Sequence, residues 1–173
     1  MKVTRKAGKI EALRQTVRSL DGSTGKVGWF PSAVYEKGQP VAGIAAVQEF
    51  GSSSRGIPPR PFFRTTATDK REEWAATSGQ LAKRAALGKM DPSQVMEGVA
   101  LAAGGHVRAT ITKIQSPKLK DATVAARKRR LANGGKGAKA TIAKPLVDTG
   151  ILLGTLSYEA NDTIKLVNEV ETK

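Results

Sequence analysis

The amino-acid sequence predicts a single α+β domain over residues 1–173, with helices packed against a small antiparallel β-sheet. Two observations support this fold class. Long stretches repeat apolar residues at helical intervals, whereas short stretches with strand character occur near residues 26–30 and again after residue 156. The basic stretch 115–145 has few apolar residues, so we expect a flexible arm inserted before a C-terminal hairpin.

The N-terminal part is predicted to contain a helix, a strand and a second helix. One face of a helix over 3–20 collects the apolar residues Ile10, Leu13, Val17 and Leu20. Residues 26–30 resemble a short strand that Pro31 ends, with 33–35 as a further edge. A helix is expected over 41–50, with Pro40 near its first turn and Gly51 just past its end.

Two longer helices are predicted in the middle of the chain. The first spans about 63–87, with Trp74, Leu81 and Ala85 facing inward. The second opens with Asp91 as N-cap and Pro92 in its first turn, and it runs to about residue 114. Gly104-Gly105 should weaken or bend it.

The C-terminal part is predicted to end in a β-hairpin. A short helix is expected within the arm, around 124–131, and apolar character returns at 146–153. Residues 156–160 and 163–170 then alternate like two strands, joined by a turn at Asn161-Asp162.

The composition excludes several classes of site. The chain has no cysteine and one histidine, which excludes disulfides, cysteine nucleophiles and zinc fingers, and we expect neither a cofactor nor a metal. No apolar run reaches the roughly 18 residues of a membrane span, and the basic N-terminus has no apolar stretch behind it, so we expect a soluble intracellular protein with no membrane contact. His106 has no acid near it in sequence, which favours a packed or exposed histidine over a catalytic one.

The positive charge is concentrated in one part of the chain. The net charge is +14, and residues 104–145 carry eleven Lys/Arg against Asp121 alone. Such a stretch favours contact with a polyanion, nucleic acid first, although a solvated arm is the simpler alternative. No zinc site, helix-turn-helix or interleaved aromatic pattern accompanies it, so only backbone contact is expected. The arm residues expected to contact DNA or a neighbouring protein are Lys118, Lys120, Arg127, Lys128, Arg129, Arg130, Lys136 and Lys139.

The motifs do not favour an enzyme. Asp148-Thr149-Gly150 matches the loop of aspartic proteases, but the 23 residues after Gly150 resemble one hairpin rather than the second half of such a fold. Asp148 is more simply expected to cap a helix that begins near Thr149. The glycine-lysine stretches lack the spacing of a phosphate-binding loop.

Two segments, in their order along the chain, resemble a known family. The first is Val41–Gly51 followed by Ile57–Arg64, and it contains the elements Glu-Phe-Gly and Pro-Arg-Pro-Phe-Phe. The second begins at Ser116–Leu119 and continues through Arg127–Arg130. It ends in Leu146–Leu152, which has the sequence Leu-Val-Asp-Thr-Gly-Ile-Leu. Together they resemble the tail-completion and head–tail joining (neck) proteins of long-tailed bacteriophages, including the phage virion morphogenesis family. The resemblance covers roughly residues 27–160, but 65–115 matches only in helical character and the N-terminal helix lies outside it.

The resemblance implies a structural virion protein and not an enzyme. Members of this family form a closed ring at the head–tail junction, so the expected assembly is a hexameric homo-oligomer around the DNA channel. Its expected partners are head connector or neck proteins and the tail tube protein, with non-specific contact to genomic DNA. The expected location is the virion neck or tail, and the host cytoplasm during assembly. Tail terminator and connector-side neck protein both remain open.

Ring contacts are expected from 49–63 and 146–153. Phe62 and Phe63 follow a rigid proline loop and are expected to insert into a neighbour's pocket, with Arg60 paired to an acid such as Glu49; alternatively they fill their own core. The full set of expected interface residues is Glu49, Phe50, Arg60, Pro61, Phe62, Phe63, Leu146, Asp148, Thr149, Gly150 and Leu152. A different function, that of a nucleoid-type or RNA-binding protein, is the alternative that the basic arm supports.

Overall fold

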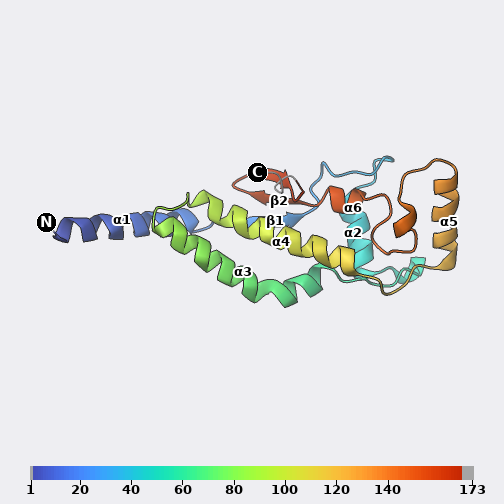
Figure 1. Ribbon diagram of the computed structural model, residues 1–173, viewed down its shortest axis with the longest axis horizontal. Coiled ribbons are helices and arrows are strands. Elements are labelled where there is room, and N and C mark those ends of the chain that lie inside the picture. The colour runs from blue at the N-terminus through green and yellow to red at the C-terminus, as the bar shows by residue number, and fades with distance from the viewer. Residues whose placement is uncertain (1, 169–173) are drawn as a thin grey trace.

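A computed structural model describes residues 2–168, with side chains from residue 10 onward apart from Ala12. Within this range the chain forms six α-helices and a three-stranded antiparallel sheet, which confirms the α+β class (Figure 1). The helices are α1 Lys2–Leu20, α2 Val41–Phe50, α3 Phe63–Ala86, α4 Ser93–Lys113, α5 Asp121–Ala132 and α6 Ile151–Gly154. The strands are β1 Gly25–Gly28, β2 Ser157–Ala160 and β3 Thr163–Leu166, and short 3-10 turns occur at Ser53–Arg55 and Lys139–Thr141.

The helix predictions hold to within a few residues. Helix α2 has the predicted bounds, and Gly51 follows it with a φ of 77°, a conformation that glycine adopts readily. Asp91 caps α4, because its carboxylate accepts a hydrogen bond from the Ser93 N–H at 2.8 Å. Hydrogen bonds from the Ser93 side chain and then from its backbone lower the pKa of Asp91, and they outweigh burial, which raises it.

The strand predictions hold in part. The further edge expected at 33–35 was wrong as a strand, because Val34 makes only an isolated bridge with Pro40. There the Tyr35 N–H bonds the Gln39 carbonyl at 2.8 Å, which closes a loop instead of extending the sheet. Part of the last predicted strand, 169–170, lies outside the described residues.

The sheet places β2 between β1 and β3, antiparallel to both. Thus the final hairpin pairs with a strand from the other end of the chain, and Ser157 lies opposite both Gly28 and Leu166. Asn161 and Asp162 have φ of 52° and 57°, as the predicted two-residue turn requires.

Helix α4 packs on the sheet and against α3 (Figure 1). It continues through Gly104-Gly105 without a break. A Cβ at Gly104 would lie 2.6 Å from Val167 Cγ2, whereas one at Gly105 would meet nothing within 4 Å. Gly104 therefore allows the chain after β3 to approach α4 closely.

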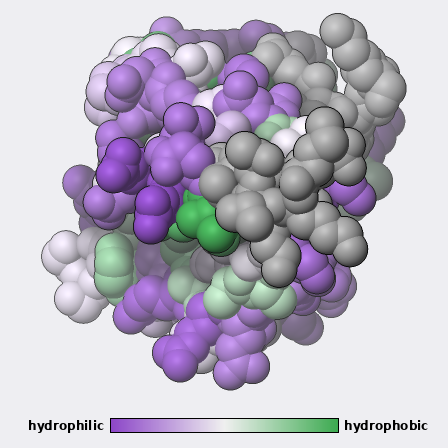
Figure 2. Space-filling model, turned by 90° about the vertical axis from the view of Figure 1, so that its left-hand side faces the viewer, coloured by the Kyte–Doolittle hydropathy of each residue, from purple (hydrophilic) through white to green (hydrophobic). Residues whose placement is uncertain are grey.

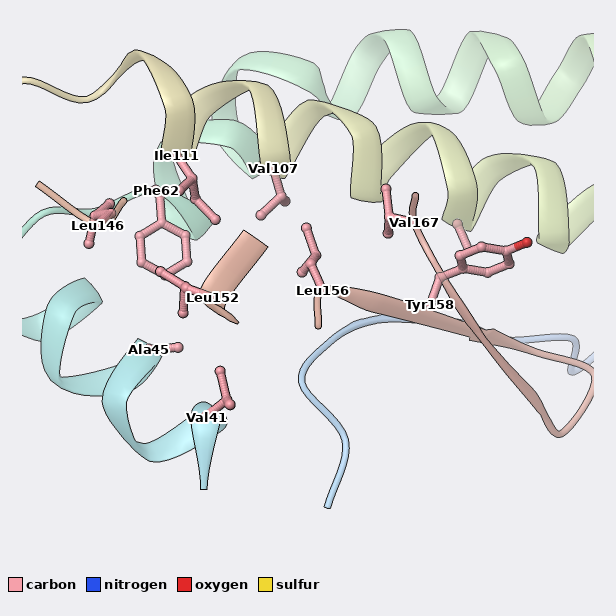
Figure 3. Close-up of a cluster of buried hydrophobic side chains, with 11 residues drawn as sticks. Val41, Ala45, Phe62, Val107, Ile111, Leu146, Leu152, Leu156, Tyr158 and Val167 are labelled. Atoms are coloured by element: carbon pink, nitrogen blue, oxygen red, sulfur yellow. The ribbon is translucent and has the colours of Figure 1, made fainter. Parts of the chain in front are cut away.

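The hydrophobic core extends along α4, between the sheet, α2 and α6 (Figure 3). Its fully enclosed side chains include Phe62, Ile111 and Tyr158. The Trp29 and Phe62 rings meet edge to face, with centroids 5.8 Å apart, and Trp29 meets Phe63 in the same way at 5.9 Å.

Helices α1 and α5 lie at opposite ends of this body: α1 extends outward along the long axis, and α5 stands across the other end (Figure 1). Helix α5 has no buried residue, and among the described side chains of α1 only Thr16 is buried. The apolar face of α1 is open: Ile10 is 52% exposed, Leu13 47% and Val17 60%. Figure 2, which views the end with α1, shows a small hydrophobic patch among largely hydrophilic side chains.

Candidate functional site

The loop between α2 and α3 forms one wall of the site. It begins at Gly51, where a Cβ would lie 2.9 Å from both the Ile57 carbonyl oxygen and the Pro59 nitrogen. Ser52 and Ile57 exchange two backbone hydrogen bonds, at 2.8 and 2.9 Å. The loop is therefore closed on itself, and it presents Arg60 at a fixed position beside α2.

Arg60 joins this loop to the segment that follows α4. Its guanidinium donates to the carbonyls of Pro117 at 2.9 Å and Lys118 at 3.3 Å, and to the side chain of Gln48 at 2.9 Å. All three acceptors are neutral, and Arg60 is only 3% exposed. Burial, followed by the charge of Arg127, lowers the pKa of Arg60. The wall thus contains a buried positive charge that forms no ion pair with the described residues.

Glu49 has a role inside the subunit that the sequence did not predict. Its carboxylate accepts hydrogen bonds from the backbone N–H groups of Phe62 at 2.7 Å, Phe63 at 2.9 Å and Arg64 at 3.1 Å, and it pairs with Arg64 Nε at 3.0 Å. Burial alone would raise the pKa of Glu49, but these hydrogen bonds outweigh burial and lower it. Glu49 therefore caps α3, and it does not pair with Arg60 within the chain.

The phenylalanines expected as anchors for a neighbouring subunit lie in their own fold. Phe62 is wholly buried in the core, and Phe63 is half-buried against it. The alternative considered above, that they fill their own core, is the arrangement found. The proline loop turns them inward because Trp29, on the chain after β1, offers an apolar partner there.

The Arg127–Arg130 cluster divides between two faces of α5. Arg127 and Arg130, one helical turn apart, point to the body and both pair with Asp148. Arg127 also donates to the carbonyls of Ile142 at 3.1 Å and Lys144 at 2.9 Å. Lys128 and Arg129, on the other face, are exposed. The four side chains therefore do not reach one polyanion together in this arrangement.

Asp148 has a different role from the predicted one. The expectation that it caps a helix near Thr149 was wrong, since α6 begins at Ile151 after Gly150 and has no side-chain cap. Asp148 instead binds the two arginines of α5, at 2.9 Å from Arg130 Nη1 and 3.4 Å from Arg127 Nε. It thereby attaches the predicted arm to the body.

Together these segments enclose a cleft of about 590 Å³. One wall is the 55–60 part of the α2–α3 loop, another is 118–130, and residues 146–152 lie between them. Six cationic side chains and one carboxylate line it: Arg55, Arg60, Lys118, Lys120, Arg127, Arg130 and Asp148. The two segments that carry the family resemblance are thus brought together around one basic site.

The other residues singled out in the sequence are distributed as follows. Leu146 and Leu152 are buried in the core, Thr149 is half-buried, and Pro61 and Gly150 are exposed. Phe50 is 65% exposed, with the Arg64 guanidinium 4.8 Å from its ring centroid. Lys136 pairs with Glu36, and Lys139 is exposed.

A polar contact between α3 and α4, centred on His106, was not predicted from the sequence. The Trp74 Nε1–H donates to His106 Nδ1 at 2.9 Å, and His106 Nε2 lies 3.3 Å from Glu73 Oε1. His106 has no acidic residue near it in the sequence, because its acidic neighbour, Glu73, comes from α3. No local sequence pattern could therefore indicate this contact. The contact joins the two helices.

Within the described residues, no group of three or more His, Asp or Glu could hold a metal ion. Over the same residues, none of the helices has both the length and the apolar character needed to cross a membrane. Comparisons of the chain with protein-family models, with curated proteins and with solved structures found no match.

Proposed function

We propose that this chain is a structural protein of a phage virion, which assembles into a ring at the head–tail junction, completes the tail and joins it to the head connector. The proposal rests on the order of the two segments that resemble that family. It is supported by their packing, since Arg60 of the first bonds the Pro117 and Lys118 carbonyls of the second.

The observation that best supports assembly is the open apolar face of α1. Ile10, Leu13 and Val17 are each about half exposed on a helix that projects from the body. Apolar side chains aligned on a projecting helix gain free energy when another surface covers them. A helix from one end that packs on a different surface of the next copy makes a head-to-tail contact, and such contacts form a ring when the rotation between successive copies closes. The exposed Phe50 and Pro61 offer a second contact surface.

The first prediction concerns this face. The variant Ile10→Ser/Leu13→Ser/Val17→Ser is expected to be monomeric where the unaltered chain is a closed oligomer, because it removes the apolar contact without disturbing the core. Light scattering coupled to gel filtration measures the mass, and negative-stain microscopy shows whether rings are present.

Val34→Ser is the matched control, since Val34 is 49% exposed and lies on the loop between β1 and α2 rather than on α1. It should leave the mass unchanged. An unaltered chain that stays monomeric at high concentration and with tail tubes present contradicts the assignment.

A second candidate is a nucleic-acid-binding protein of nucleoid or RNA-binding type. The exposed Lys128 and Arg129 on the outer face of α5 favour it, because exposed cations on the outside of a helix can meet backbone phosphates. Duplex binding by the monomer with a steep dependence on salt would favour this function over ring assembly.

A further inference from the structure

The basic cleft has an imbalance of charge that the fold itself does not neutralise. Asp148, the one carboxylate in its lining, is already shared by Arg127 and Arg130. Arg60 has only neutral hydrogen-bond acceptors. No ion pair joins the remaining cations of the lining, Arg55, Lys118 and Lys120, to any described residue.

Such a site favours an anion from outside. A guanidinium that is buried without an acidic partner, as Arg60 is, costs free energy that a nearby negative charge offsets. The low exposure also reduces screening by solvent, so that the field of Arg60 and Arg127 acts inside the cleft. The exposed lysines 118 and 120 then provide cations that a ligand can reach directly.

The cleft also has an apolar component. The half-buried Ile44, Ile57 and Leu119 line it, and so do the buried Leu146 and Leu152. A ligand that fills this space must therefore cover apolar side chains as well as meet cations. A small inorganic anion can meet the cations, but it cannot cover the apolar side chains.

A peptide satisfies both requirements better than a nucleic acid does. The phosphates of a duplex lie on a broad convex surface, and they meet exposed cations such as Lys128 and Arg129 more readily than the wall of a 590 Å³ cleft. Single strands gain much of their affinity by stacking bases on aromatic rings, and Tyr35 is the one aromatic residue in the lining. In an extended peptide, successive side chains point to opposite sides, so acidic groups can reach the exposed cations while apolar groups cover the half-buried side chains.

We propose that the cleft between the α2–α3 loop and α5 binds an extended peptide segment of a partner protein, in which acidic side chains alternate with apolar ones. The acidic groups pair with Lys118, Lys120 and Arg55, and the apolar groups cover Ile57 and Leu119. This inference goes beyond the proposed function and holds whether or not the chain forms a ring.

The test uses the full chain and a fluorescein-labelled octapeptide of alternating glutamate and valine, followed by anisotropy at about 0.15 M ionic strength. The unaltered chain is expected to bind it saturably. Lys118→Gln/Lys120→Gln should weaken binding roughly tenfold, because two rim cations are lost. Lys128→Gln/Arg129→Gln, which removes the same charge from the outer face of α5, should change affinity by less than about twofold. All four side chains are exposed, so both variants should fold, and circular dichroism checks this.

Three outcomes overturn the proposal. The first is the absence of saturable peptide binding. The second is an equal loss in both variants, which means that net charge alone attracts the peptide. The third is a cleft variant that loses affinity for labelled duplex DNA but not for the peptide, which makes the cleft a nucleic-acid site. Neither the Lys118/Lys120 pair nor the Lys128/Arg129 pair lies on α1. Measuring the oligomeric state of these variants therefore tests ring assembly separately from peptide binding.

Discussion

At the scale of single residues, neighbours in the sequence serve different purposes in the fold. Arg127 and Arg130 hold Asp148, while Lys128 and Arg129 between them are exposed. The division follows from the helical period, which puts residues three apart on one face. The sequence predicted a short helix around 124–131, within which these residues lie, but it did not predict that one face of this helix would meet Asp148.

Glu49 allows a direct test at this scale. Glu49→Gln is expected to lower the free energy of unfolding by about 2 kcal/mol at pH 7, because it removes the charge from a buried cap that accepts several N–H groups. Urea unfolding followed by far-ultraviolet circular dichroism measures the change.

The pH dependence of this effect has a definite sign. The pKa of Glu49 is lowered in the folded state, so its charge stabilises the fold above the unfolded value, near 4.5. That stability is lost as pH falls from 4.5 through the lowered pKa. The difference in free energy of unfolding between Glu49→Gln and the unaltered chain should therefore become smaller in this pH range. Glu72→Gln, an exposed acid on α3, should change stability by less than about 0.5 kcal/mol. Equal stability of Glu49→Gln and the unaltered chain at pH 7 would contradict the capping role.

At the scale of elements, the helices were the most predictable part of the fold. Their ends depend on local chemistry, as Pro40 and Gly51 show for α2 and Asp91 for α4. The strand predicted at 33–35 does not form, because the hydrogen bond from the Tyr35 N–H to the Gln39 carbonyl closes a loop and competes with strand pairing there. Strand pairing depends on distant partners, and β1 pairs with a strand at the other end of the chain.

The adjacent glycines of α4 give an internal comparison. Gly105→Ala should raise the free energy of unfolding by about 0.5–1 kcal/mol, because alanine favours the helix and the site is open. Gly104→Ala should lower it, since the new methyl group would meet Val167, a stiff side chain, at 2.6 Å. Thermal unfolding of the two variants in one buffer measures both. If Gly104→Ala and Gly105→Ala change the free energy of unfolding in the same direction, Val167 does not pack closely against Gly104.

At the scale of the whole molecule, the fold brings together distant segments whose proximity the sequence did not predict. The segments 49–63 and 146–153 were both predicted as ring contacts. In the fold, most of these side chains point inward and bring the two segments together, so that Phe62 and Leu152 share one core. Local patterns carry no information about which distant segment a side chain meets, and the cleft exists only through such contacts. For instance, the sequence of the proline loop does not indicate that Phe62 packs against Trp29.

The attachment of α5 to the body gives the last prediction. Because α5 has no buried residue, its position depends on polar contacts, of which the ion pairs with Asp148 are central. In Asp148→Asn the guanidinium of Arg127, with its side chain 11% exposed, loses the one acidic partner that the described residues provide. The α5 amides should then exchange with deuterium roughly tenfold faster, while amides of the core helix α4 keep their rates. Glu36→Gln, which removes the exposed pair with Lys136, should have little effect on α5, because an exposed ion pair contributes little. Equal exchange from α5 in both variants would mean that other contacts hold the helix, and that the wall of the cleft does not depend on Asp148.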